Sequence, residues 1–121
     1  MNLNQVTIAV DNFDVSFEFY KNLGLVPIVK SQHYARFVME NNCTFSIHKR
    51  DESFSGTIIY FECNDLDVKV GELKSKGFEF IDELKNKQWL WREILLKDPD
   101  GNILCLYFAG ENRINPPWKL K

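Results

Sequence analysis

The chain has few histidines and cysteines, the residues that bind transition metals or form disulfides. Its 121 residues include two histidines, His33 and His48, and three cysteines, Cys43, Cys63 and Cys105. The cysteines are odd in number and share no Cys-x-x-Cys spacing, which argues against a disulfide framework. Reduced thiols in strand-like runs are typical of a reducing compartment, so we expect a cytoplasmic protein.

Long runs of one charge or of apolar residues are also missing. The formal net charge is -2 without a long basic run, which argues against nucleic acid or an anionic membrane as a partner. No apolar run approaches the ~20 residues of a membrane span, and the N-terminal MNLNQV lacks the features of a signal peptide. With 45% hydrophobic and 26% charged residues, the composition is that of one globular domain, and a small molecule is the expected partner.

Two weakly related halves organise the chain. Residues 5–28 (QVTIAVDNFDVSFEFYKNLGLVPI) align with residues 58–81 (IIYFECNDLDVKVGELKSKGFEFI). The aligned pairs include Asp14 with Asp67 and Gly24 with Gly77, which are positions typical of a helix start and a helix stop. Each half is therefore predicted to have the same fold.

Each half predicts a βαβββ unit. An apolar strand leads into DN or ND, which can cap a helix, and helices are predicted near 13–22 and 66–75. Further strands are predicted at about 26–31, 33–40 and 43–49, and at 78–82, 89–97 and 102–109. Module one is thus predicted at 1–51, module two at 57–109 and a C-terminal tail at 110–121, with ESFSG (52–56) as the linker.

Side chains alternate across a strand, so the best predicted strands can be divided into two faces. One is apolar and is expected beneath the helices: Val6, Ile8, Val10, Phe45, Ile47, Ile59, Phe61, Cys63, Leu104, Leu106 and Phe108. The other mixes polar and small apolar groups: Gln5, Thr7, Ala9, Thr44, Ser46, His48, Ile58, Tyr60, Glu62, Ile103, Cys105 and Tyr107. Ligand cavities are lined in this way. A sheet face covered by a partner subunit is the alternative.

The order of these elements resembles the vicinal oxygen chelate superfamily, which contains glyoxalases, bleomycin resistance proteins and ring-cleaving dioxygenases. The resemblance rests on the paired βαβββ modules, the opening QVTIAVDNFDVSFEFYKNLGL and the late REILLKDPDGNILCLY. It implies an α+β fold in which two βαβββ modules form a curved mixed-sheet cup with the helices on the outer face. It also implies a site inside the cup and, often, a second subunit, so we expect a homodimer.

Metal-dependent members of the superfamily bind their ion at four positions, which the resemblance places at Gln5, Ser46, Ile58 and Cys105. None of these is the histidine or carboxylate of the family's pattern. Divalent ions in octahedral sites need imidazoles and carboxylates, and an isoleucine donates nothing. We therefore predict no metal ligand and no cofactor. The alternative is a metal-dependent lyase, isomerase or dioxygenase with atypical ligands such as His48 and Cys105.

The stretch WLWREILLKDPDGN, residues 89–102, resembles the metal-free branch of the superfamily, the bleomycin resistance proteins. Trp89 and Trp91 lie two residues apart and are predicted to share one face of an extended strand. They would form either a stacking wall for a flat ligand, which we favour, or a dimer contact. Arg92 would bind a carboxylate of the guest or, more commonly, one of its own protein.

The predicted function is metal-independent binding of a small aromatic or amphipathic molecule in an aromatic-lined cup, with drug resistance by sequestration as one form. Eight residues are predicted to bind it: Ser46, His48, Tyr60, Trp89, Trp91, Arg92, Cys105 and Tyr107. No residue is predicted to be catalytic, and a binding protein is favoured over an enzyme. Glu62, near a strand end, is expected to be solvated, and the tail is expected to pack on the body as a strap.

Overall fold

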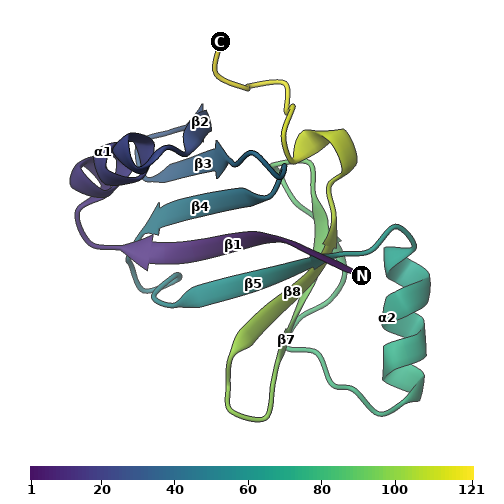
Figure 1. Ribbon diagram of the computed structural model, residues 1–121. Helices are drawn as coiled ribbons and strands as arrows, with labels where there is room; N and C mark the ends of the chain where they lie inside the picture. Colours follow the sequence, from purple (N-terminus) through teal and green to yellow (C-terminus); the bar gives the residue numbers. More distant parts are fainter.

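The computed structural model describes residues 1–121 and contains one eight-stranded mixed sheet with two α-helices (Figure 1). The strands are β1 (Asn2–Val10), β2 (Val26–Lys30), β3 (Tyr34–Val38), β4 (Thr44–Lys49), β5 (Thr57–Glu62), β6 (Lys85–Asn86), β7 (Arg92–Lys97) and β8 (Ile103–Phe108). The helices are α1 (Phe13–Leu23), α2 (Leu66–Ser75) and the short 3-10 helix η1 (Gly110–Asn112). The predicted α+β fold with a curved sheet is confirmed. Neither α-helix has the length and apolar content needed to cross a membrane.

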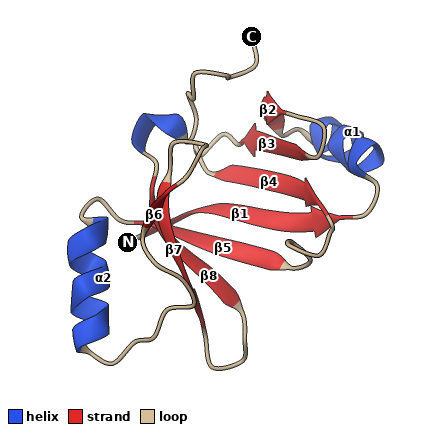
Figure 2. Cartoon of the chain, turned by 180° about the vertical axis from the view of Figure 1, so that it is seen from behind, coloured by secondary structure: helices blue, strands red, loops and turns tan.

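The two modules join edge to edge within one chain. The strand order is β2-β3-β4-β1-β5-β8-β7-β6, so the first strands of the two halves lie side by side at the centre of the sheet. β1 pairs with β5 antiparallel, whereas β1 with β4 and β5 with β8 are parallel. Figures 1 and 2 show that β7 and β8 turn away from the direction of β3 and β4, which gives the sheet its curvature.

Each helix covers the apolar face of its own module, which we call the outer face. The core under α1 comprises Val10, Phe13, Phe17, Ala35, Phe37 and Ile47. The core under α2 comprises Cys63, Leu66, Val70, Ile94, Leu96 and Leu106. These cores contain residues that the alternation predicted for this face, although Phe108, at the end of β8, is 41% exposed. The opposite face, which we call the inner face, is covered by neither α-helix.

The repeated start and stop signals act as predicted at most positions. The Asn12 side chain caps α1 by accepting a hydrogen bond from the backbone N–H of Val15 at 3.2 Å. Gly24 and Gly77 follow the two helices with φ of 118° and 93°, a left-handed conformation that costs glycine little. Asp65 makes no side-chain capping bond, so α2 begins without that support.

The predicted strand at 78–82 is wrong, because β6 is formed by Lys85–Asn86 instead. The backbone N–H of Ile81 donates to the carbonyl of Leu95 at 2.9 Å, but the Asp82 side chain accepts the N–H of Leu95 at 2.8 Å. A side chain therefore occupies the position at which a strand would place its own carbonyl, and pairing resumes only three residues later.

Candidate functional site

The inner face brings together six of the eight predicted binding residues. Ser46, Cys105 and Tyr107 have no exposed surface, Trp91 is 3% exposed, and His48 and Tyr60 are half-buried. Because the first four are covered by other side chains and by the C-terminal tail, only part of this face is accessible. The inner face therefore has a closed half and an open half.

The C-terminal tail covers the closed half of the inner face and bonds to both modules. The carbonyl of Asn112 accepts hydrogen bonds from Arg36 Nη1 on β3 and from Trp91 Nε1 just before β7, each at 3.2 Å. The carbonyl of Arg113 accepts a second bond from Arg36 Nη1 at 3.0 Å. Figure 2 shows η1 next to the strands of module two, where the tail begins. The predicted packing of the tail on the body agrees with these contacts. We define the closed half by Asn4, Arg36, Glu62, Trp91, Tyr107 and Arg113, of which Arg36 also borders the open half through its bond to the Tyr34 hydroxyl.

Glu62 anchors the start of the tail. Its carboxylate accepts hydrogen bonds from the backbone N–H groups of Ala109 (2.7 Å) and Gly110 (2.9 Å), and from Asn4 Nδ2 (2.9 Å). Arg113 Nε lies 3.7 Å from Glu62 Oε1, and the two side chains are only 12% and 13% exposed. The expectation of a solvated Glu62 is wrong, since the tail covers this strand end.

Hydroxyl and amide groups form a continuous network across the middle of the inner face. Gln5 Nε2 donates to Thr7 Oγ1 and to Ser46 Oγ, both at 2.9 Å. The Tyr34 hydroxyl bonds to Ser46 Oγ at 2.8 Å, and it accepts a hydrogen bond from Arg36 Nε at 3.0 Å. Buried polar groups need such partners, and here the protein supplies them itself.

The residues at the family's metal positions do not fit a divalent ion in octahedral coordination. The Gln5 amide donates to neighbouring hydroxyls, Ile58 has no donor atom, and Cys105 is completely buried. Burial raises the pKa of the Cys105 thiol well above its ordinary 9.0, which disfavours the thiolate that binds metals. His48 packs against Phe54, with 5.1 Å between ring centroids. No three His, Cys, Asp or Glu side chains lie close enough together to hold a metal ion.

A buried carboxylate on the inner face is one of the residues that sequence reasoning missed, together with Tyr34, Arg36 and Phe54. Glu93 is 6% exposed and accepts a hydrogen bond from Cys105 Sγ at 3.4 Å, and it forms no salt bridge. Burial raises the pKa of its carboxyl above the ordinary 4.5, although the bond from Cys105 opposes that shift. Alternation along β7 could have found it, because Glu93 lies two residues before Leu95, which is paired with Cys105.

The raised pKa of Glu93 predicts a loss of stability as the pH rises. Between the ordinary pKa of 4.5 and the higher folded pKa, the folded state binds more protons than the unfolded state, so the free energy of unfolding falls with pH. Below 4.5 both states are protonated and this penalty is absent. Glu93→Gln carries no charge, so its stability relative to wild type should improve as the pH is raised from about 4 to about 8. Urea unfolding at several pH values measures this difference. A difference in the free energy of unfolding that stays the same at every pH would contradict the raised pKa of Glu93.

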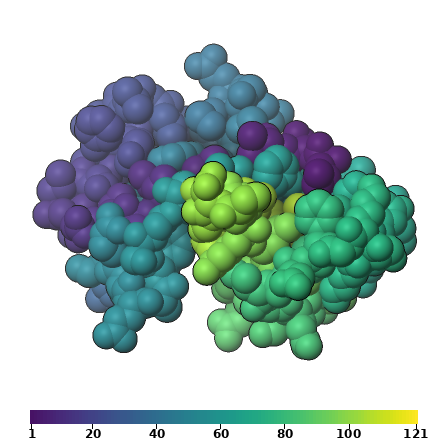
Figure 3. All heavy atoms as spheres, turned by 90° about the horizontal axis from the view of Figure 1, so that it is seen from below, coloured from purple at the N-terminus to yellow at the C-terminus, as the bar shows by residue number.

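The open half of the inner face lies at the opposite strand ends. It consists of partly exposed side chains from both modules and the linker: Ala9, Tyr34, His48, Phe54, Ile58, Tyr60, Leu95 and Ile103. The His48 ring centroid lies 5.1 Å from that of Phe54 and 6.3 Å from that of Tyr34, which makes an aromatic cluster on module one. Seen from below, the surface is notched between teal atoms, from the middle of the chain, and green atoms of module two (Figure 3). This half is accessible and mostly apolar.

Two predicted binding residues do not join the inner face. The first is Trp89, which does not share a strand face with Trp91 as predicted. Leu90 between them has φ of 68°, and both tryptophans belong to a turn. A 2.7 Å hydrogen bond from the Lys87 N–H to the Trp91 carbonyl closes this turn. Trp89 is 39% exposed. Arg92 lies on the outer face, where its Nε and Nη2 reach the two carboxylate oxygens of Asp67 at 2.8 and 3.0 Å. Of the two outcomes predicted for Arg92, the commoner one, an ion pair within the protein, is observed.

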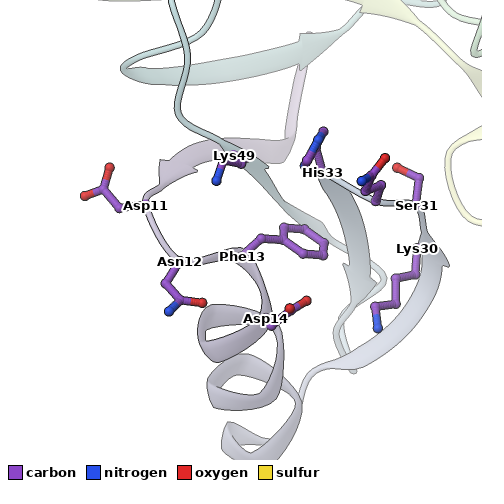
Figure 4. Close-up of a pocket in the computed structure, with 9 residues that line it drawn as sticks. Asp11, Asn12, Phe13, Asp14, Lys30, Ser31, His33 and Lys49 are labelled. Carbon is purple, nitrogen blue, oxygen red and sulfur yellow. The ribbon is translucent and has the colours of Figure 1, made fainter.

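A separate surface hollow of about 530 Å³ lies beside the first turn of α1 (Figure 4). Its lining is Asp11, Asn12, Phe13, Asp14, Lys30, Ser31, Gln32, His33 and Lys49. The two aspartates and the two lysines offset one another in charge, and only one hydrophobic residue lines the hollow. It therefore lacks the apolar lining that binds organic ligands.

Known proteins share this architecture. The sequence profile of the Glyoxalase/Bleomycin resistance protein/Dioxygenase superfamily matches residues 2–106, and the chain belongs to this superfamily. The uncharacterized protein YraH of Bacillus subtilis (strain 168) is 24% identical over 88% of this chain and 98% of YraH. A Legionella pneumophila structure described as NAD-dependent benzaldehyde dehydrogenase is 26% identical with a TM-score of 0.71, over 88% of this chain and 98% of that one. Streptomyces coelicolor methylmalonyl-CoA epimerase, in complex with 2-nitronate-propionyl-CoA, is 16% identical with a TM-score of 0.65, over 90% and 97% of the two chains, and shows the fold.

Proposed function

We propose that the protein binds a small aromatic or amphipathic molecule in the open half of its inner face, without a metal ion. The observation that supports this most is the contrast between the two halves. The closed half is filled by side chains that bond to the tail, whereas the open half presents Tyr34, His48, Phe54 and Tyr60 only partly covered. Partly covered aromatic and apolar side chains in a concave face are typical of a site for a small organic ligand.

The side chains of the open half favour binding by contact area and stacking. His48 and Phe54 lie on or near module one, and Ile58 and Tyr60 lie on β5 of module two. A flat guest between these groups would touch aromatic faces on one side and apolar groups on the other. Such contacts need no electron-pair donors for a cation, which agrees with the unsuitable residues at the family's metal positions. Sequestration of a toxic compound is one role that such a binding protein performs.

A second candidate function is acid–base catalysis, because Glu93 is a buried carboxylate with a raised pKa on the same face. Groups of this kind act as proton acceptors or donors in many active sites. The Streptomyces coelicolor epimerase of the same fold is an enzyme that interconverts epimers. We rank this function second, since Glu93 contacts a thiol with a raised pKa and lies outside the partly exposed group that forms the open half.

Titration calorimetry with the neutral probe 2-naphthamide tests the proposal. The protein is first dialysed against EDTA, and saturable binding at one site per chain is expected to remain. Phe54→Ala and His48→Ala should each weaken binding about 5- to 10-fold, because each removes an aromatic contact. Trp89→Ala, in the turn away from the inner face, is the matched control and should leave binding unchanged. Binding that disappears with EDTA and returns with a metal, or no saturable binding, would refute the proposal.

A further inference from the structure

We infer that the molecule bound in the open half carries an anionic group of the carboxylate class, which pairs with the guanidinium of Arg36. This inference rests on the proposed function and adds the charge of the guest to it. The observation behind it is a buried arginine whose partners within the protein are all neutral.

Arg36 is 2% exposed and lies on the inner face of β3, opposite Ser46 in the pairing of β3 with β4. Its Nε donates to the Tyr34 hydroxyl at 3.0 Å, and its Nη1 donates to the carbonyls of Asn112 and Arg113 at 3.2 and 3.0 Å. Its Cζ lies 4.5 Å from the centroid of the Trp91 ring. These contacts orient the group and partly solvate its charge, but none of them neutralises it.

The other three arginines of the chain show what Arg36 lacks. Arg50 pairs with Asp11, Arg92 pairs with Asp67, and Arg113 lies beside Glu62. Arg36 is the arginine without a carboxylate within salt-bridge distance, although it is more buried than any of these paired groups. Burying a charge without a counter-ion is costly, so a position of this kind is retained most readily where a ligand supplies the opposite charge.

The two carboxylates of the inner face, the largely covered Glu62 and the buried Glu93, are committed elsewhere. Glu62 is engaged by Arg113, Asn4 and the backbone at the start of the tail. Glu93 accepts its hydrogen bond from Cys105 on module two. Neither is a hydrogen-bond partner of Arg36.

Arg36 also has donor capacity left for a guest. Its Nη2 makes no hydrogen bond within the chain. Arg113 Nε is the single polar side-chain atom that lacks both a hydrogen-bond partner and contact with solvent, so Arg36 Nη2 keeps some contact with solvent. Arg36 is bonded to the hydroxyl of Tyr34, a half-buried residue of the open half, so the guanidinium lies beside the accessible region. A carboxylate placed there can accept a charge-assisted bond from Nη2 and a bond from the Tyr34 hydroxyl.

A pair of probes with the same ring system and different charge tests this inference. Calorimetry on the full-length protein compares 2-naphthoate with 2-naphthamide, and wild type is expected to bind 2-naphthoate about 10-fold or more tightly. Arg36→Met should remove this preference and leave the affinity for 2-naphthamide within about 2-fold of wild type. Arg92→Met removes the same charge from the outer face and serves as the control, which should keep the preference.

The outcomes separate the inference from the proposed function. Equal affinity of wild type for both probes overturns the inference and leaves the proposed function intact, whereas no binding of either probe overturns both. If Arg36→Met still prefers 2-naphthoate, another residue binds the carboxylate of the guest, and the inference is also overturned. Because Arg36 bonds the tail, circular dichroism checks the fold of the variant, and the wild-type comparison stands even if that variant is unfolded.

Discussion

Replacing Trp91 by alanine is expected to lower the free energy of unfolding by about 3–5 kcal/mol, a large fraction of the stability of a small domain. The indole is 3% exposed, its ring centroid lies 4.9 Å from that of Tyr107 and 5.8 Å from that of Tyr60, and the Arg36 guanidinium stacks on it. Its Nε1 also donates to the carbonyl of Asn112. The substitution therefore creates a cavity and releases one attachment of the tail at the same time.

Urea unfolding followed by circular dichroism measures the Trp91 effect. Trp89→Ala is the matched control, because this residue type occurs two positions earlier in the turn and is 39% exposed; its effect should stay within about 0.5 kcal/mol. Similar losses for both variants would show that Trp91 is not buried between the modules and the tail. A change in oligomeric state with unchanged chain stability would instead assign Trp91 to a subunit interface.

Replacing Glu62 by alanine is expected to destabilise the protein by a comparable amount, about 3–5 kcal/mol, because it leaves Arg113 buried without its counter-ion. The same change removes the acceptor of the Ala109 and Gly110 N–H groups and of Asn4 Nδ2. These bonds hold the beginning of the tail on the sheet. The tail should therefore become accessible to protease at concentrations of urea too low to unfold the body.

Limited proteolysis with mass spectrometry of the released tail, together with urea unfolding, measures the Glu62 effect. Asp67→Ala breaks the exposed pair with Arg92 and is the control, since exposed ion pairs contribute little. It should leave the tail protected. If Glu62→Ala and Asp67→Ala gave equally small losses and an equally protected tail, the proposed anchoring role of Glu62 would be wrong.

The two helices were predictable from the sequence because their signals are local. Apolar side chains at helical spacing and a glycine after each helix depend only on neighbours within one or two turns. α1 and α2 consequently begin at Phe13 and Leu66, where the sequence predicts. The apolar and polar faces of the main strands followed from alternation in the same way. The internal repeat indicated that each half of the chain forms the same βαβββ module.

The failures of prediction occur where a long-range contact or a local turn replaces the expected strand. The segment at 78–82 looked like a strand, but the Asp82 side chain takes a backbone donor of β7. Trp89 and Trp91 looked like neighbours on a strand, but a left-handed Leu90 separates them. In each case a competing partner or turn overrides the alternation, and sequence spacing carries no information about that competition.

The amino-acid sequence by itself determined the paired βαβββ plan, the outer core and the absence of metal-type side chains at the four family positions. The first two follow from periodicity and residue type, which are properties of short stretches, and the third follows from the resemblance to the superfamily. Only the tertiary structure decided that the tail closes one half of the inner face, that Glu93 is buried and Glu62 largely covered there, and that Arg36 has no carboxylate partner. The physical reason is that burial and charge pairing depend on contacts between residues far apart in the chain, such as Arg36 with Asn112 and Glu62 with Arg113.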